Sequence, residues 1–185
     1  MAVTLSVVLL APASIAAGAA PPRAHIAPDL RALFYAAVQI VRVTNQPTFS
    51  DAVMLEADGL TANGQPTTSA DGIVSWNFFL DNHSSGSSFL SASVSFGPLP
   101  ARFGQVTGST QLFVEDKVIP RVPRMPVSEA VARLHHAGYG QSFYNVTLRN
   151  PMGPNQHSNP LYIFGFADNT YVAVDTVTGK VAPFS

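Results

Sequence analysis

Two stretches of the chain carry the apolar spacing of an amphipathic helix. In residues 28–43, apolar side chains recur three or four positions apart, at Leu30, Leu33, Phe34, Ala37, Val38 and Val41. Asp29 suits the first turn of that helix, and Asn45-Gln46-Pro47 ends it. Residues 128–138 show the same spacing, with an apolar face of Val127, Ala130, Val131, Leu134 and Ala137. Each stretch therefore predicts one helix with a buried face.

Each predicted helix is followed by three stretches with the composition and alternation of strands. After the first helix these are residues 52–57, 73–80 and 89–96; after the second they are residues 143–149, 161–166 and 171–176. Asp58-Gly59, with two similar pairs after it, indicates turns in the long connection between the first two strands. The order helix, strand, strand, strand thus occurs twice.

An internal repeat explains this order. Residues 76–82 and 162–169 are both aromatic strands that end in Asp-Asn. The competing explanation is that helix-plus-meander order is common and the shared residues are coincidental.

Residues 97–126 are rich in proline, which predicts a connector on the surface of the fold, with a short edge strand at 112–114. We expect an α+β fold of two helix-plus-antiparallel-meander units, residues 21–96 and 127–185, packed as one compact domain.

The second unit begins its helix with Val127-Ser128-Glu129-Ala130, and its last predicted strand ends in Val174-Asp175 before a turn at Thr178-Gly179. In these features it resembles the PepSY domain, a small module of metalloprotease propeptides and other exported bacterial proteins. The resemblance covers residues 127–184, with a longer loop at 150–160 and less charged strands than is usual. It implies a PepSY/cystatin-like fold that binds or inhibits peptidases and brings no catalytic residue. For the first unit, the resemblance rests on the internal similarity alone.

The N-terminal residues 1–20 have the pattern of a secretory signal peptide. An apolar run from Val3 to Leu10 leads into small residues, and Ala17-Gly18-Ala19 fits the small-x-small cleavage rule, although no Lys or Arg precedes the run. The alternative is a helix or strand that the mature protein keeps. No later stretch approaches the about 20 apolar residues of a membrane span. We therefore expect a secreted protein, with N-glycosylation sequons at Asn82 and Asn145 if the source is eukaryotic.

Composition narrows the classes of function. Hydrophobic residues make up 46% of the chain, which argues against overall disorder, whereas charged residues make up only 11% and the net charge is −1. A protein that binds nucleic acid would show a basic excess or stripe, and none is present. A surface so poor in charge offers little repulsion between copies, so self-association is a candidate property. The lack of cysteine excludes disulfides and thiolate metal ligands.

No pattern of catalytic or cofactor-binding residues emerges. His135 and His136 are adjacent, so on a helix they point about 100° apart and cannot readily share a metal ion. The chain has no Gly-x-Ser-x-Gly elbow and no glycine pattern for nucleotides. Glu56 and Asp58 alternate on one strand face, but such a pair is more typical of solvated charges than of general acid–base chemistry. We predict no catalytic residue, no cofactor and no metal.

Aromatic side chains are the best remaining candidates for binding. Alternation along residues 73–80 puts Trp76 on the core face of its strand and Phe79 on the opposite face, where Phe79 is a candidate for an interface. The candidate binding residues are Phe79, Trp76, Tyr162, Tyr171 and His135.

Three functions are compatible with these patterns. The first is an exported, non-enzymatic module that binds a protein or peptide through its sheet face or an edge strand, in the manner of a peptidase inhibitor. The second is a self-assembling extracellular subunit. The third is a small-molecule-binding or enzymatic α+β pocket, whose inward polar residues would be Tyr35, Asn77 and His135. The sequence favours the first and leaves enzymatic activity open.

Overall fold

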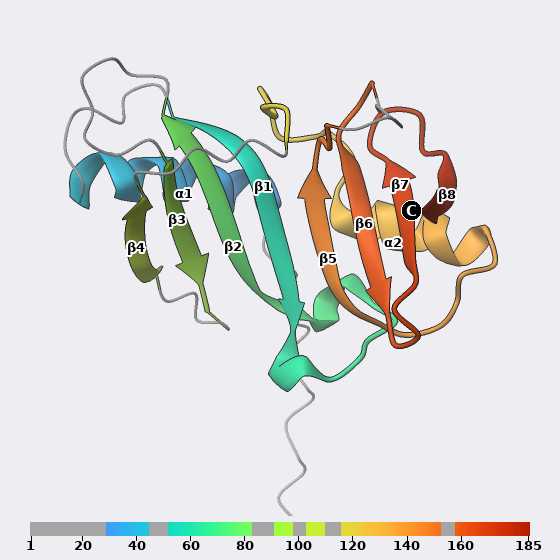
Figure 1. Cartoon of the computed structure of the whole chain (residues 1–185). Coiled ribbons are helices and arrows are strands. Elements are labelled where there is room, and N and C mark those ends of the chain that lie inside the picture. Colours follow the sequence, from blue (N-terminus) through green and yellow to red (C-terminus); the bar gives the residue numbers. More distant parts are fainter. Residues whose placement is uncertain (1–28, 45–51, 83–90, 98–102, 110–115, 153–157) are drawn as a thin grey trace, which may run out of the picture.

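The described residues form one antiparallel β-sheet with two α-helices on one side of it (Figure 1). The computed structural model describes residues 29–44, 52–82, 91–97, 103–109, 116–152 and 158–185. The elements are α1 (Leu30–Thr44), β1 (Ala52–Thr61), η2 (Ala62–Gly64), η3 (Ala70–Gly72), β2 (Ile73–Asn82), β3 (Ser91–Phe96), β4 (Phe103–Ser109), α2 (Val127–His136), β5 (Phe143–Arg149), β6 (Leu161–Phe166), β7 (Tyr171–Asp175) and β8 (Val181–Phe184). The predicted α+β class is confirmed, with more sheet than expected.

The strand order is β4-β3-β2-β1-β5-β6-β7-β8, and every neighbouring pair is antiparallel. Each helix therefore precedes a meander of four strands, and the two meanders join where β1 pairs with β5 in the middle of the sheet. The sequence predicted three strands after each helix; the structure adds β4 to the first meander, and the chain that returns after the predicted turn at Thr178-Gly179 forms β8. The predicted edge strand at 112–114 lies outside the described residues.

Strand β1 is longer than the sequence predicts. It continues through Asp58-Gly59, where a turn was expected, to Thr61. A Cβ atom at Gly59 would lie 2.9 Å from side-chain atoms of Ile73, Trp76 and Val146. Gly59 therefore leaves room for the Trp76 indole inside the sheet–helix interface, and packing across strands outweighs local turn preference.

The main apolar core lies between the helices and the sheet, and a smaller buried cluster of Leu161, Ile163 and Ala173, with Phe184 packed against it, lies on the opposite face of β6 and β7. Helix α1 packs on β2, β3 and β4, whereas α2 packs on β7 and η3. The main core includes Val41 of α1, Leu134 of α2 and the fully buried rings of Phe78 and Phe164. Because both helices contribute to this one cluster, they cover the same face of the sheet, as Figure 1 shows.

The described part of the connector is anchored in the core, which corrects the expectation that it lies on the surface. Ile119 is 1% exposed and pairs with Met54 of β1, and its N–H donates to the Met54 carbonyl at 2.7 Å. Met125 is also buried, just before α2. These apolar side chains draw residues 116–126 inward, although that stretch forms no helix or strand.

The predicted turn between the last two strands is confirmed. Asp175 accepts hydrogen bonds from the backbone N–H groups of Val177 and Thr178, at 2.9 and 2.7 Å. Gly179 has a φ of +71°, which favours glycine. Burial alone would raise the pKa of Asp175, but hydrogen bonds from Thr178, Asn159 and Val177 outweigh burial and lower it.

Candidate functional site

The face of the sheet opposite the helices, here called the open face, carries polar side chains at its centre. On β1, Glu56 and Asp58 point to this face because Ala57 and Gly59 point to the core. Across the seam with β5, Glu56 pairs with Arg149 and Asp58 pairs with Thr147. Together with Asp116, these four residues form what we call the central polar cluster.

Hydrogen bonds hold this cluster together. The Thr147 hydroxyl donates to Asp58 Oδ1 at 2.8 Å, and Arg149 Nε donates to Asp116 Oδ1 at 2.9 Å. The Asp116 side chain is only 1% exposed, and its second oxygen has no hydrogen-bond partner in the described structure. The Oδ1 atom of nearby Asn150 is also buried and without a partner there. Buried carboxylates normally have all their oxygens satisfied, so Asp116 is an unusual group.

Glu56 has the most strongly altered acidity in the cluster. Burial, charge repulsion from Asp58 and a hydrogen bond to Asp58 raise its pKa from 4.5 to about 8, with Asp116 adding to the increase and Arg149 opposing it. At neutral pH, Glu56 is therefore protonated and donates to Asp58. The expectation that Glu56 and Asp58 are simply solvated charges is wrong, because β5 and the connector partly bury them.

On β2, the cluster is bordered by Phe79 and Asn77. Phe79 lies opposite Glu56 in the β1–β2 register, and Asn77 lies opposite Asp58. The Ser95 hydroxyl of β3 donates to Asn77 Oδ1 at 3.0 Å. Phe79 was proposed from the sequence as an interface residue, and the structure places it on the open face, half-buried beside the acids.

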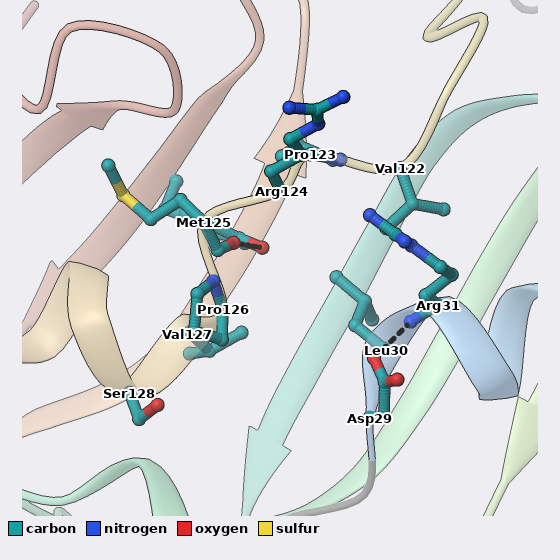
Figure 2. A pocket seen from close by; sticks show the side chains of 11 residues that line it. Asp29, Leu30, Arg31, Val122, Pro123, Arg124, Met125, Pro126, Val127 and Ser128 are labelled. Carbon is teal, nitrogen blue, oxygen red and sulfur yellow. Dashed lines mark hydrogen bonds between the residues drawn. The ribbon is translucent and has the colours of Figure 1, made fainter.

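A second candidate site is a cavity of about 400 Å³ between the N-terminal ends of the two helices (Figure 2). Figure 2 shows its two walls, the first turn of α1 on one side and the connector residues 122–128 on the other. Arg31 contributes from the first wall, and Arg124 and Ser128 contribute from the second. A cavity of this size suits a small molecule.

Tyr162 of β6 also lines this cavity. Its hydroxyl donates to the Met125 carbonyl at 3.0 Å, which ties the connector to the sheet. Burial, with a smaller effect of the Asp29 charge, raises the pKa of Tyr162 above its ordinary value, so the hydroxyl keeps its proton. Asp29 also accepts a hydrogen bond from the Arg31 N–H at 3.0 Å, which caps α1.

The binding residues chosen from the sequence do not form one site. Trp76 and Tyr162 are buried on the helix side of the sheet, whereas Phe79 lies on the open face. Tyr171 is 46% exposed at the start of β7, and His135 lies on α2 with its Nε2 buried and without a partner in the described structure.

The polar residues suggested for a small-molecule pocket do not converge either. Tyr35 is exposed on α1, Asn77 lies on the far side of the sheet, and His135 lies on α2. The cavity between the helix ends is lined by other residues, Arg31 and Arg124 among them. No signal in the sequence singles these arginines out, since their proximity depends on how the connector crosses the sheet.

The two glycosylation sites stay predictions. Asn82 is the last residue of β2, and the rest of its sequon lies outside the described residues. Asn145 is half-buried on the open face, where its side chain lies over Gly165; a Cβ atom there would come within 2.6 Å of Asn145 Oδ1.

Within the described ranges, no three His, Cys, Asp or Glu side chains are placed to hold a metal ion, and no described helix is long and apolar enough to span a membrane. No protein-family model, curated protein or solved structure matches the chain.

Proposed function

We propose that this protein is an exported, non-enzymatic module that binds a peptide or protein segment on the open face of its sheet. The observation that carries the proposal is the central polar cluster. It sits half-buried in the middle of a sheet face that neither helix covers, and it contains a protonated Glu56 and a buried Asp116 with an unpaired oxygen. Perturbed acids of this kind gather at functional sites more often than at purely structural ones.

The side chains around the cluster also suit an interface. A row across the open face runs from Leu60 of β1 through Asn145 and Gly165 to Tyr171 of β7. Leu60 is 50% exposed and Tyr171 is 46% exposed. Large apolar and tyrosine side chains beside a polar centre are typical of protein-binding surfaces.

Peptide selection with two matched variants tests this proposal. Short random peptides are selected on the full chain, and their affinity is then measured for Ser95→Arg and Ser128→Arg. Both serines are exposed, but Ser95 lies on the open face, whereas Ser128 lies in the first turn of α2 and lines the cavity. We expect Ser95→Arg to remove binding and Ser128→Arg to leave it unchanged. Selected peptides that bind both variants as well as the original chain would refute the open-face proposal.

The cavity supports a second candidate, the binding of a small anionic molecule. Arg31 and Arg124 bring positive charge to its two walls, and no described acid forms an ion pair with either of them. A carboxylate or phosphate group would suit two such guanidinium groups. Here the same variants give the opposite result: Ser128→Arg alters binding of an anion such as citrate, and Ser95→Arg does not.

We further propose that the two halves arose by duplication of a PepSY-like unit. In support, each helix precedes a four-strand meander. In each half, the strands follow one another in sequence order from the β1–β5 seam to the edge of the sheet. The export proposal rests on the sequence pattern of residues 1–20. Intact-mass measurement of protein from its native source tests it, since a mass that includes these residues would contradict cleavage.

A further inference from the structure

The central polar cluster holds more negative than positive charge. Asp58 and Asp116 are carboxylates, Arg149 is the one guanidinium among the cluster's five residues, and Glu56 adds a further negative charge when it loses its proton. Arg149 is engaged with Asp116 beneath the surface through its Nε. The guanidinium is thus held by the buried acid, and the negative charge of Asp58 faces the open side of the sheet.

The buried acid strengthens this imbalance. Asp116 Oδ2 has no hydrogen-bond partner in the described structure, although the side chain is 1% exposed. Its charge is therefore only partly offset by the contact of Oδ1 with Arg149. In a setting that excludes water, this charge is poorly screened and adds to the attraction of the cluster for a cation.

The border of the cluster suits the stem of a long basic side chain. Phe79 lies directly across the β1–β2 ladder from Glu56 and shares the open face with it. Side chains opposite each other on one face of an antiparallel pair are about 5 Å apart at Cβ. An aromatic ring next to two acids offers packing for methylene groups and a favourable ring face for a cation.

We infer that the central polar cluster binds the charged end of a lysine or arginine side chain from a partner's extended segment, with the aliphatic stem lying on Phe79. This inference rests on the proposed function, because it assumes that a peptide occupies the open face. It goes beyond that function by naming the chemistry that the partner must carry.

Binding of the cation displaces one proton. Glu56 is a neutral carboxylic acid that donates to Asp58, so an arriving ammonium or guanidinium group replaces this hydrogen bond, and the Glu56 proton passes to the solvent. The charged groups that act on Glu56 are Asp58 on its own strand, Arg149 on β5 and Asp116 on the connector. Its neighbour on β2 is the uncharged Phe79.

Peptides that differ in one side chain test the inference. The probes are blocked peptides of alternating threonine and valine around a central lysine, arginine, norleucine or glutamate, titrated into the ¹⁵N-labelled full chain. We expect the lysine and arginine peptides to shift the amide signals of β1 and β5 and to bind about tenfold more tightly than the norleucine peptide. Asp58→Asn should lower the affinity of the lysine peptide to that of norleucine. The matched control is Asp71→Asn, an exposed acid in η3, which should have no effect.

Proton release gives a second readout. The affinity for the lysine peptide should rise between about pH 6 and about pH 8. Calorimetry in two buffers should detect released protons. Glu56→Gln should abolish both effects. If the norleucine peptide shifts the same signals with equal affinity, the inference fails and the proposed function stands. If Asp71→Asn weakens binding as much as Asp58→Asn, general charge attraction explains the result and the inference fails. If no peptide shifts the open-face signals, both fail.

Discussion

Replacing Glu56 with glutamine tests the electrostatics of the central polar cluster without any ligand. In the folded chain, burial and Asp58 raise the pKa of Glu56 from 4.5 to about 8. Unfolding exposes the carboxyl group and returns its pKa to the ordinary value. Between these two pH values the unfolded chain has lost a proton that the folded chain still holds, so stability declines as the pH rises. The contribution of the Glu56 proton to the stability of the fold is complete below pH 4.5 and is lost above about pH 8.

The size of this effect follows from the same two values. A difference between 4.5 and about 8 corresponds to about 5 kcal/mol, at roughly 1.4 kcal/mol for each pKa unit. Solvent reaches the half-buried carboxyl and screens its interactions, so we expect about 2 kcal/mol. Glutamine does not titrate, and its amide can donate to Asp58 as the protonated acid does. The stability of Glu56→Gln relative to the original chain should therefore increase by about 2 kcal/mol from about pH 5 to about pH 9.

Urea denaturation over a series of buffers measures this difference. Trp76 is the one tryptophan of the sequence and is buried beside Gly59, so its fluorescence reports unfolding of the core. Glu129→Gln, which changes an exposed carboxyl paired with Arg133 on α2, is the control for the chemical change alone. A stability difference between Glu56→Gln and the original chain that stays constant across this pH range would refute the reasoning.

Three other substitutions test the core, the ion pair and the connector, each by urea denaturation at neutral pH. Phe78→Ala removes a fully buried ring that packs on Phe96 and should cost about 3–5 kcal/mol; a loss below about 1 kcal/mol would contradict its core position. Arg149→Met leaves the buried Asp116 without its cation and should cost about 3 kcal/mol, part of which Arg149→Lys should restore. Tyr162→Phe removes one buried hydrogen bond to the connector and should cost about 1–2 kcal/mol, and an unchanged midpoint would show that this bond contributes nothing.

Elements with long periodic apolar faces could be predicted from the sequence. The first helix was expected at 28–43 and spans Leu30–Thr44, and the strands Phe143–Arg149 and Leu161–Phe166 have the expected bounds. Strand β4 was missed because its sequence, with Gly104 and Gly108, has little apolar alternation, and its conformation depends on pairing with β3. Long-range pairing of this kind leaves only a weak local signal.

The candidate site was harder to predict for the same reason. Glu56 and Asp58 could be placed on one strand face, but nothing local to them showed that β5 would lie beside that strand. Arg149 and Asp116 are 33 residues apart, and they meet because the connector crosses beside the end of β5. The spacing of residues along one strand says which side chains share a face, but it does not say which charges will face them from another strand.

The seam between β1 and β5 also has a consequence for the order of folding. Each meander joins strands that follow one another in the sequence, whereas the seam joins distant residues such as Asp58 and Thr147, which are 89 positions apart. Closing so long a loop costs more chain entropy than forming the hairpins, so we expect the seam to form late. The central polar cluster is built from both sides of the seam. Partly folded chains that have completed only one half would therefore lack the binding site, and binding of a partner would select chains whose two halves have joined.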